Sequence, residues 1–262
     1  LVDPGPRATV PTLLAALEEL GVQRLDAILL THIHIDHAGG AGLVANRYPE
    51  ARVYSHPVAI PHLVDPAKLW AGSLKVLGGL AEAYGEIAPI PEAAIDFREA
   101  FEVGPLRVRA LDTPGHAAHH LSFAVGDVLF AGEVAGVHRA LASGTYLRPA
   151  TPPVFRYDVF CRSIDQVAAL EPAHLCFGHY GHTPEARRTL GLARSQIDLW
   201  VRVVDRHLTR GAEPLDEAVF QALLEVDPHF ALYRELPADV QRRERTFFTN
   251  TVAGLRGYLQ ER

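Results

Sequence analysis

The sequence of 262 residues contains no methionine, two cysteines and only two lysines beside 23 arginines. Cys161 and Cys176 are too few for a disulfide framework or a cysteine-rich zinc module, and their spacing excludes a redox CxxC motif. This scarcity of cysteine favours a reducing cytoplasm. Because the chain lacks a starter methionine, we expect it to begin inside a longer protein, and a secretory leader stays an open alternative.

Long apolar runs and a basic surface are also missing. No run of about 18 uncharged apolar residues occurs, so we expect no membrane span. The net charge is −6, from 25 basic and 31 acidic residues, and the absence of a sustained basic face argues against a nucleic-acid partner. The composition, 48% apolar and 21% charged, is that of an ordinary globular protein, long enough for one large domain with an elaborated lid.

The apolar pattern predicts alternating strands and helices. The expected helices cover residues 11–20, 36–48 and most of the chain from 184 onward. The expected strands cover residues 26–31, 51–55, 106–111, 121–125, 128–131 and 174–177. Strand, helix and strand in this rhythm indicate an α/β layer structure.

Residues 56–99 interrupt this rhythm with helical turns, five prolines and no strand alternation. We expect a helical insertion there that acts as a lid, because Trp70 and several leucines supply more apolar surface than an exposed insertion should show. Plain packing against the core and a dimer contact are alternatives of equal weight. The expected organisation is a catalytic domain over 1–183, with the lid at 56–99, and a helical C-terminal region over 184–262 packed on it.

The strongest chemical signal is an HxHxDH cluster directly after the predicted strand 26–31. Open α/β sheets place their ligand sites at such strand ends. Neutral imidazoles and a carboxylate suit Zn²⁺, and also Fe or Mn where the geometry permits. The cluster offers four potential ligands within six residues: His32, His34, Asp36 and His37. Since one catalytic ion with an open position does not use four such ligands, the cluster predicts two metal ions.

With this cluster the sequence resembles the metallo-β-lactamase fold hydrolases, in which HxHxDH is followed by a distant histidine, an acidic residue and a last histidine. The matching elements are the turn Asp3-Pro4-Gly5, the TPGH that ends at His116, the FAGE that ends at Glu133 and the FGH that ends at His179. The resemblance covers about residues 1–183. It implies a four-layer α/β/β/α sandwich, with a helical insertion and a helical C-terminal region, whose two sheets meet at the metal site.

The resemblance also implies a ligand for each metal position. His32, His34 and His116 would hold the first ion, while Asp36, His37 and His179 would hold the second. Glu133 would bridge the two ions. The family usually has aspartate at this bridging position, so a mixed or weakly occupied second site stays open.

Other polar residues near the motif receive supporting roles. Asp36 is the candidate catalytic residue, because a ligating carboxylate can also orient a nucleophilic water. Asp3 and Asp112 are candidates to accept hydrogen bonds from ligating imidazoles. His120, four residues after His116, fits such a supporting role better than a ligand role.

These features predict a hydrolase that uses two divalent metal ions, most simply Zn with Fe or Mn as alternatives, and a bridging hydroxide as nucleophile. We expect a small-molecule ester, thioester or lactone as substrate, because the helical tail resembles the glyoxalase II and lactonase-like branches of the family. A phosphodiesterase, a mononuclear iron dioxygenase similar to the persulfide dioxygenases and a non-catalytic binding module stay open. We expect no nucleic-acid or membrane partner, and a homodimer is a further alternative.

Overall fold

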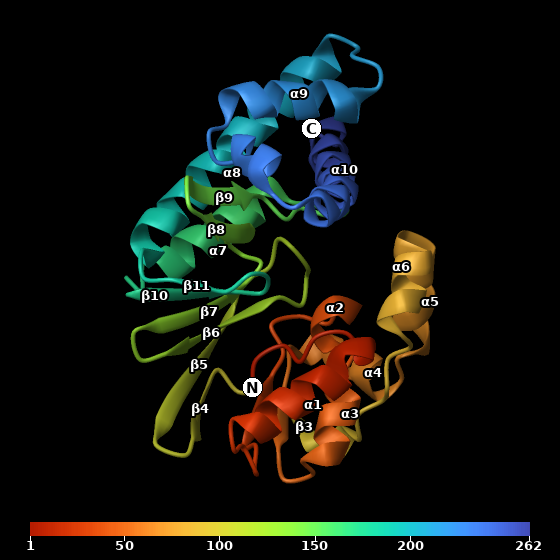
Figure 1. Cartoon of the computed structure of the whole chain (residues 1–262), viewed down its shortest axis with the longest axis vertical. Helices are drawn as coiled ribbons and strands as arrows, with labels where there is room; N and C mark the ends of the chain where they lie inside the picture. Colours follow the sequence, from red (N-terminus) through yellow and green to blue (C-terminus); the bar gives the residue numbers. More distant parts are fainter. The chain divides into compact units, whose positions relative to one another are not determined.

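The computed structural model describes all 262 residues, which form two compact units (Figure 1). The first unit comprises Leu1–Asp112 and His119–Gly126, and the second comprises Thr113–Ala118 and Asp127–Arg262. Both units combine helices with β-structure, so the expected α/β class is confirmed. The domain boundary expected after residue 183 marks the end of the segment that contains the family-like motifs. It is not defined by contacts between residues, as the two units are, and it stays a prediction.

A three-stranded parallel sheet in the first unit leads into the HxHxDH motif. Its order is β1 (Ala27–Leu29), β2 (Arg52–Tyr54) and β3 (Ile95–Asp96). Val2 forms a further parallel bridge with Leu29. Parallel strands buried on both faces read as continuous apolar runs rather than as alternating ones, and β1 is buried throughout.

Helices cover this sheet and bury its apolar side chains. The helices of the first unit are η1 (Arg7–Thr9), α1 (Val10–Glu19), α2 (Ile35–Ala38), α3 (Ala41–Arg47), η2 (Pro57–Ala59), α4 (Ile60–Val64), α5 (Ala67–Leu77), α6 (Gly79–Tyr84) and η3 (Glu92–Ala94). Ile28 and Val53 from the strands are fully buried, together with Val44 from α3. The motif therefore follows a strand that is buried in the core of this unit.

The single helix expected over 36–48 is in fact two helices, α2 and α3, separated at Gly39 and Gly40. A Cβ at Gly40 would lie 2.4 Å from Cγ2 of Val10. The N–H of Gly40 also donates to the carbonyl of Gly5, 2.8 Å away. The helix breaks because this glycine lets the backbone touch α1 and the opening turn, a tertiary requirement that helical periodicity does not record.

The insertion at 56–99 is helical as expected, but it ends in β3, a strand of two residues that is too short to produce an alternating pattern. Its first helix, α4, buries Leu63 completely in the main core. The pair α5 and α6 packs on a separate cluster that contains Ile35 of the HxHxDH motif, Ala81 and Ile87. One part of the insertion thus belongs to the core, and another part rests on the motif itself.

Antiparallel strands complete the first unit, and the second unit contains both parallel and antiparallel strand pairs. In the first unit β5 (Leu106–Asp112) pairs with β4 (Ala100–Val103) and with β6 (Leu121–Val125). In the second unit β10 (His174–Phe177) pairs in parallel with β7 (Val128–Gly132) and antiparallel with β11 (His182–Thr183). A separate hairpin consists of β8 (Val137–Leu141) and β9 (Gly144–Arg148). The strands β4, β8, β9 and β11 have no counterpart among the expected elements.

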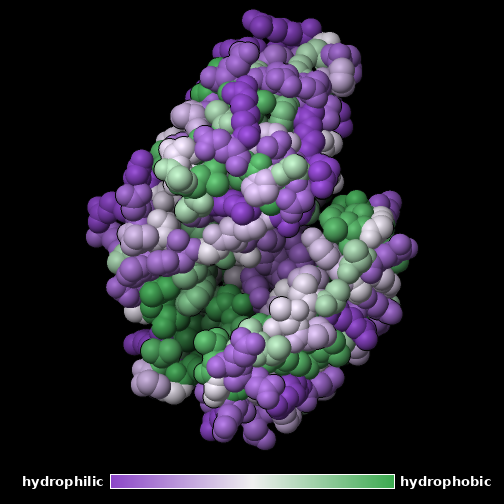
Figure 2. All heavy atoms as spheres, viewed as in Figure 1, coloured by the Kyte–Doolittle hydropathy of each residue, from purple (hydrophilic) through white to green (hydrophobic).

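Helices make up the rest of the second unit. They are α7 (Tyr157–Ala168), α8 (Ala186–Thr209), α9 (Leu215–Val226), η4 (Ala231–Glu235) and α10 (Ala238–Gln260). Trp200 of α8 is fully buried and donates to Asp227 at 2.7 Å, so its polar edge is satisfied inside the core. Polar residues cover most of the visible outer face of α9 and α10 (Figure 2). No helix is both long and apolar enough to cross a bilayer.

We expect Leu63→Ala to lower the free energy of unfolding by about 2–5 kcal/mol, because the change leaves a cavity at a fully buried position. Val76→Ala provides the control, since Val76 lies in the same insertion and is 70% exposed. Its cost should stay within about 0.5 kcal/mol. Urea unfolding of both variants measures the difference, and equal costs would contradict the anchoring of α4 in the core.

Candidate metal centre

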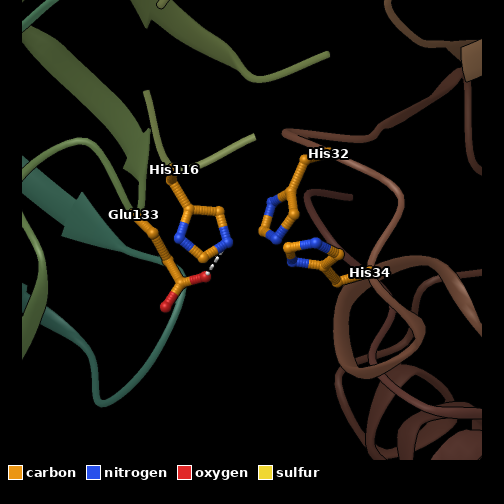
Figure 3. A group of neighbouring side chains, drawn as sticks. All are labelled: His32, His34, His116 and Glu133. Atoms are coloured by element: carbon orange, nitrogen blue, oxygen red, sulfur yellow. Dashed lines mark ion pairs between the residues drawn. The ribbon is translucent and has the colours of Figure 1, made fainter. Parts of the chain in front are cut away.

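The histidines of the HxHxDH motif gather at the end of β1 and in the short helix α2. His32 and His37 are buried, and the centroids of their rings lie 4.1 Å apart. The ring of His34 meets that of His32 edge to face at 4.6 Å (Figure 3). Three imidazoles this close together in a buried setting suit the binding of a cation by their unprotonated nitrogens.

Asp3 accepts three hydrogen bonds from Thr31 and His37, the residues before and at the end of the motif. Its Oδ1 accepts the backbone N–H of Thr31 at 2.8 Å, and its Oδ2 accepts the Thr31 hydroxyl at 2.6 Å. The same Oδ2 lies 2.9 Å from Nδ1 of His37. Because a carboxylate only accepts, Nδ1 of His37 carries the proton and donates, which leaves Nε2 of His37 available to a metal ion.

Through Thr31, Asp3 also sets which ring nitrogen of His32 carries the proton. The Thr31 hydroxyl donates its proton to Asp3 and lies 3.0 Å from Nδ1 of His32. Its oxygen must therefore accept the Nδ1 proton of His32, and Nε2 of His32 becomes the potential ligand atom. One carboxylate thus fixes the tautomers of two histidines.

The turn that carries Asp3 is itself held by the motif. The N–H of Asp3 donates to the carbonyl of Leu29, and the N–H of Gly5 donates to the carbonyl of His37, both at 3.0 Å. Asp3 has a positive φ of 43°, which few residues other than glycine adopt. The orienting role predicted for Asp3 agrees with these contacts. Asp112 is instead exposed and lies 3.6 Å from Nε2 of His56.

Asp36 and His120 lie beside this group. Oδ2 of Asp36 is 3.8 Å from Nε2 of His37, and the Asp36 side chain is 19% exposed, so solvent reaches it. His120 is fully buried, with its ring centroid 5.4 Å from that of His32. This place fits the supporting role expected for His120 better than a ligand role. The four predicted ligands of the motif lie together in the first unit.

The second unit brings together the other three predicted ligands. Oε2 of Glu133 lies 2.8 Å from Nε2 of His116, the ion pair drawn in Figure 3. Oε1 of the same carboxylate lies 3.5 Å from Nε2 of His179. Glu133 thus presents one oxygen to each histidine, as a bridging carboxylate would. The longer side chain reaches both histidines, so the departure from aspartate does not by itself disrupt this group.

The position of His116 depends on close backbone packing. Gly115 has a positive φ of 139°, and a Cβ there would lie 2.7 Å from Cα of Phe160 in α7. The Ser163 hydroxyl of the same helix donates to the carbonyl of Pro114 at 2.6 Å. The glycine of the TPGH sequence therefore permits a contact with α7 that any larger residue would prevent.

Two features of the second unit could not be predicted from the sequence. The carbonyl of Ala150 accepts the Nδ1 proton of His116 at 3.0 Å, which leaves Nε2 facing Glu133. Arg148 is buried; burial alone would lower its pKa, but nearby negative groups, Glu244 first and Glu133 among the others, raise it. A backbone carbonyl can be supplied by any residue, so only a structure identifies Ala150.

The donor types fit a divalent transition metal. The predicted ligands are imidazole nitrogens and carboxylate oxygens, the donors that Zn²⁺, Fe and Mn use in proteins. Hydrogen bonds at Nδ1 set the tautomers of His32, His37 and His116. Asp3, His32 and His37 also form a close group of potential donors. Asp3 already accepts three hydrogen bonds, so its contacts fit the predicted orienting role better than a ligand role.

Comparison with known proteins relates the chain to one large family. A family model described as the metallo-beta-lactamase superfamily matches residues 1–179. The metallo-beta-lactamase fold-containing protein ST1585 of Sulfurisphaera tokodaii is 35% identical over 167 residues, 61% of this chain and 62% of the relative. The hydroxyacylglutathione hydrolase of Aeromonas hydrophila is 40% identical over 34% of this chain and 36% of its own length. That of Cupriavidus taiwanensis is 35% identical over 51% of this chain and 43% of its own length. The matched segments thus span less than two thirds of each of these relatives.

Solved structures show the same fold over nearly the whole chain. The crystal structure of ST1585 covers 97% of this chain and 87% of its own, with a TM-score of 0.71 and 23% identity. The metallo-beta-lactamase family protein TTHA1429 from Thermus thermophilus covers 99% and 84%, with a TM-score of 0.67 and 24% identity. At these identities the likeness concerns the fold alone, and it confirms the fold class expected from the motifs.

We expect Asp3→Asn to weaken metal binding by about 10- to 100-fold, because the amide cannot accept all three hydrogen bonds that orient Thr31 and His37. Asp26→Asn is the matched control, since Asp26 pairs with Arg24 at the surface. Competition with a chromogenic chelator measures the affinity. Equal affinities in the two variants would show that Asp3 does not control the ligands.

Proposed function

Because the chain belongs to the metallo-β-lactamase superfamily, we propose that it is a metal-dependent hydrolase. The proposed metal ligands are His32, His34, Asp36 and His37 in the first unit and His116, Glu133 and His179 in the second. The observation that carries this proposal is the clustering of the predicted ligands within each unit. Thr31, Asp3 and Ala150 accept the Nδ1 protons of His32, His37 and His116, respectively.

We propose two ions rather than one. Glu133 supports this number, because its two carboxylate oxygens lie near two different histidines. When bound, divalent ions supply Lewis acidity and lower the pKa of a coordinated water. In this proposal Asp36 accepts a hydrogen bond from a water and orients it toward a substrate carbonyl, a role that its partial exposure beside the buried His37 supports.

Among carboxylic substrates we place thioesters ahead of esters and lactones. Several relatives are named hydroxyacylglutathione hydrolases, and such thioesters are anionic at neutral pH. Tyr180 follows His179, is 37% exposed and has the guanidinium groups of Arg139 and Arg243 at 5.0 and 5.2 Å from its ring centroid. Positive charge beside a ligand histidine favours an acidic substrate over a neutral one.

The remaining elements of the proposal follow from composition. Both cysteines are free, which is consistent with a reducing cytoplasm. The net charge of −6 favours a small-molecule substrate over nucleic acid. A homodimer stays an alternative that a mass measurement in solution would decide.

Elemental analysis followed by a substrate panel tests the function. We expect close to two equivalents of Zn per chain in protein purified without added metal, and turnover of acidic thioesters ahead of neutral esters, lactones and phosphodiesters.

We expect His116→Ala to lower turnover by at least about 100-fold and to remove one equivalent of metal, because no other histidine replaces this ligand. One equivalent of Fe with oxygen consumption would instead indicate the dioxygenase, and full activity of His116→Ala would overturn the proposed centre.

We propose that α5 and α6 form a lid that selects the substrate without binding metal. Hydrophobic residues gather at the exposed end of this helix pair (Figure 2), where Val76 is 70% exposed. Trp70 of α5 is half-buried against the cluster that contains Ile35, next to the ligand His34.

We therefore expect Trp70→Ala to raise the Michaelis constants of bulky substrates several-fold with two metal ions still bound. Kinetics over the substrate panel together with metal analysis provide the measurement. A variant that only becomes less stable or changes its oligomeric state would argue for plain packing.

A further inference from the structure

A short segment that starts at the last residue of β9 contacts both His116 and the turn that follows Glu133. We refer to residues 148–151 as the support segment. The carbonyl of Ala150 accepts the Nδ1 proton of His116 at 3.0 Å. A Cβ at Gly136 would lie 2.2 Å from the carbonyl of the first residue of the segment, and the N–H of Gly136 donates to the carbonyl of Glu133. The segment thus sets the surroundings of two of the proposed ligands.

The first residue of the support segment is bound to α10 through a buried ion pair. Nε of Arg148 donates to Oε2 of Glu244 at 2.5 Å, and the Tyr146 hydroxyl donates to the same oxygen at 2.8 Å. Burial alone would raise the pKa of Glu244, but Arg148 and these hydrogen bonds outweigh it and hold that pKa below its usual value. The carboxylate therefore stays ionised, and α10 holds the segment with a charged contact in a region closed to water.

The rest of the segment lies directly on the backbone of α10. The Thr251 hydroxyl donates to the carbonyl of Pro149, and the Thr151 hydroxyl donates to the carbonyl of Thr251, both at 3.3 Å. A Cβ at Gly254 would lie 2.0 Å from the carbonyl oxygen of Thr151. This close approach requires glycine, because real Cβ atoms do not come so near to a backbone oxygen.

We propose that α10 positions His116 and Glu133 for metal binding, with Gly254 and Thr251 as positioning residues that act through the support segment. The inference rests on the metal centre of the proposed function. Groups that orient a ligand imidazole set both its direction and its basicity. A helix that fixes the carbonyl of Ala150 therefore controls metal affinity without touching the metal.

A pair of glycine substitutions on the same helix tests this role. Gly254→Ala forces the backbone of the support segment to move, whereas a Cβ at Gly257, almost one turn further along α10, meets no atom within 4 Å. We expect Gly254→Ala to weaken Zn²⁺ binding by about 10- to 100-fold and Gly257→Ala to change it by less than about twofold. Chelator competition on the full chain measures the affinity, at a temperature where circular dichroism shows each metal-free variant to be folded.

A spectroscopic reading separates positioning from a general loss of stability. The Nδ1–H proton signal of His116 in the NMR spectrum should shift in Gly254→Ala and stay in place in Gly257→Ala, because only the first change moves the acceptor carbonyl. Should Gly254→Ala fail to fold, Thr251→Val keeps the shape of the side chain and removes only the hydrogen bond to Pro149. We expect that variant to lose several-fold in Zn²⁺ affinity.

Each outcome has one meaning. Unchanged affinity in a folded Gly254→Ala or Thr251→Val variant overturns the role of α10 and leaves the proposed hydrolase intact. Equal losses in Gly254→Ala and Gly257→Ala also overturn it, since the effect would then belong to the helix in general. A wild-type chain that binds Zn²⁺ but hydrolyses no substrate of the panel would refute the proposed activity alone, and a chain that binds no metal would refute both proposals.

Discussion

Three hydrogen bonds converge on the carboxylate of Asp3, and the arrangement of the histidines in the first unit depends on them. The negative charge makes these bonds stronger than bonds between neutral groups. They connect the opening turn to the end of β1 and decide which nitrogen of the His32 and His37 rings stays unprotonated. The positive φ of Asp3 costs backbone energy, which the three bonds offset.

In the second unit a predicted ligand histidine is oriented by a neutral group rather than by a carboxylate. A neutral carbonyl, that of Ala150, orients His116. The charged groups here are Arg148 and Glu244, which pair with each other and do not contact His116 through this carbonyl. Glu244 offsets the positive charge of this buried guanidinium, which also interacts electrostatically with Glu133. A buried arginine without that partner would compete with a metal ion for the Glu133 carboxylate.

The sequence predicted those parts of the site that depend on which side chains are present and how they are spaced. The spacing of His32, His34 and His37 indicated the motif, and the apolar run before it indicated β1. What escaped prediction depends on backbone: the carbonyl of Ala150, the helix break at Gly40 and the approach of Gly254 to the support segment. Strands of two residues, such as β3 and β11, are too short for a periodic signal. The β8–β9 hairpin escaped because polar residues such as His138 and Arg148 stand at buried positions of its strands.

The contacts between α10 and the support segment also bear on the order in which the molecule forms during synthesis. At about 5–20 residues per second, roughly 7–28 seconds separate the emergence of His116 from that of Gly254. During this interval the Ala150 carbonyl lacks the helix that holds it, whereas the turn, strand and helices around Asp3 are already complete. On the proposed role of α10, the nascent chain carries one finished and one unfinished set of predicted ligands, and full metal affinity would arise only once α10 has formed.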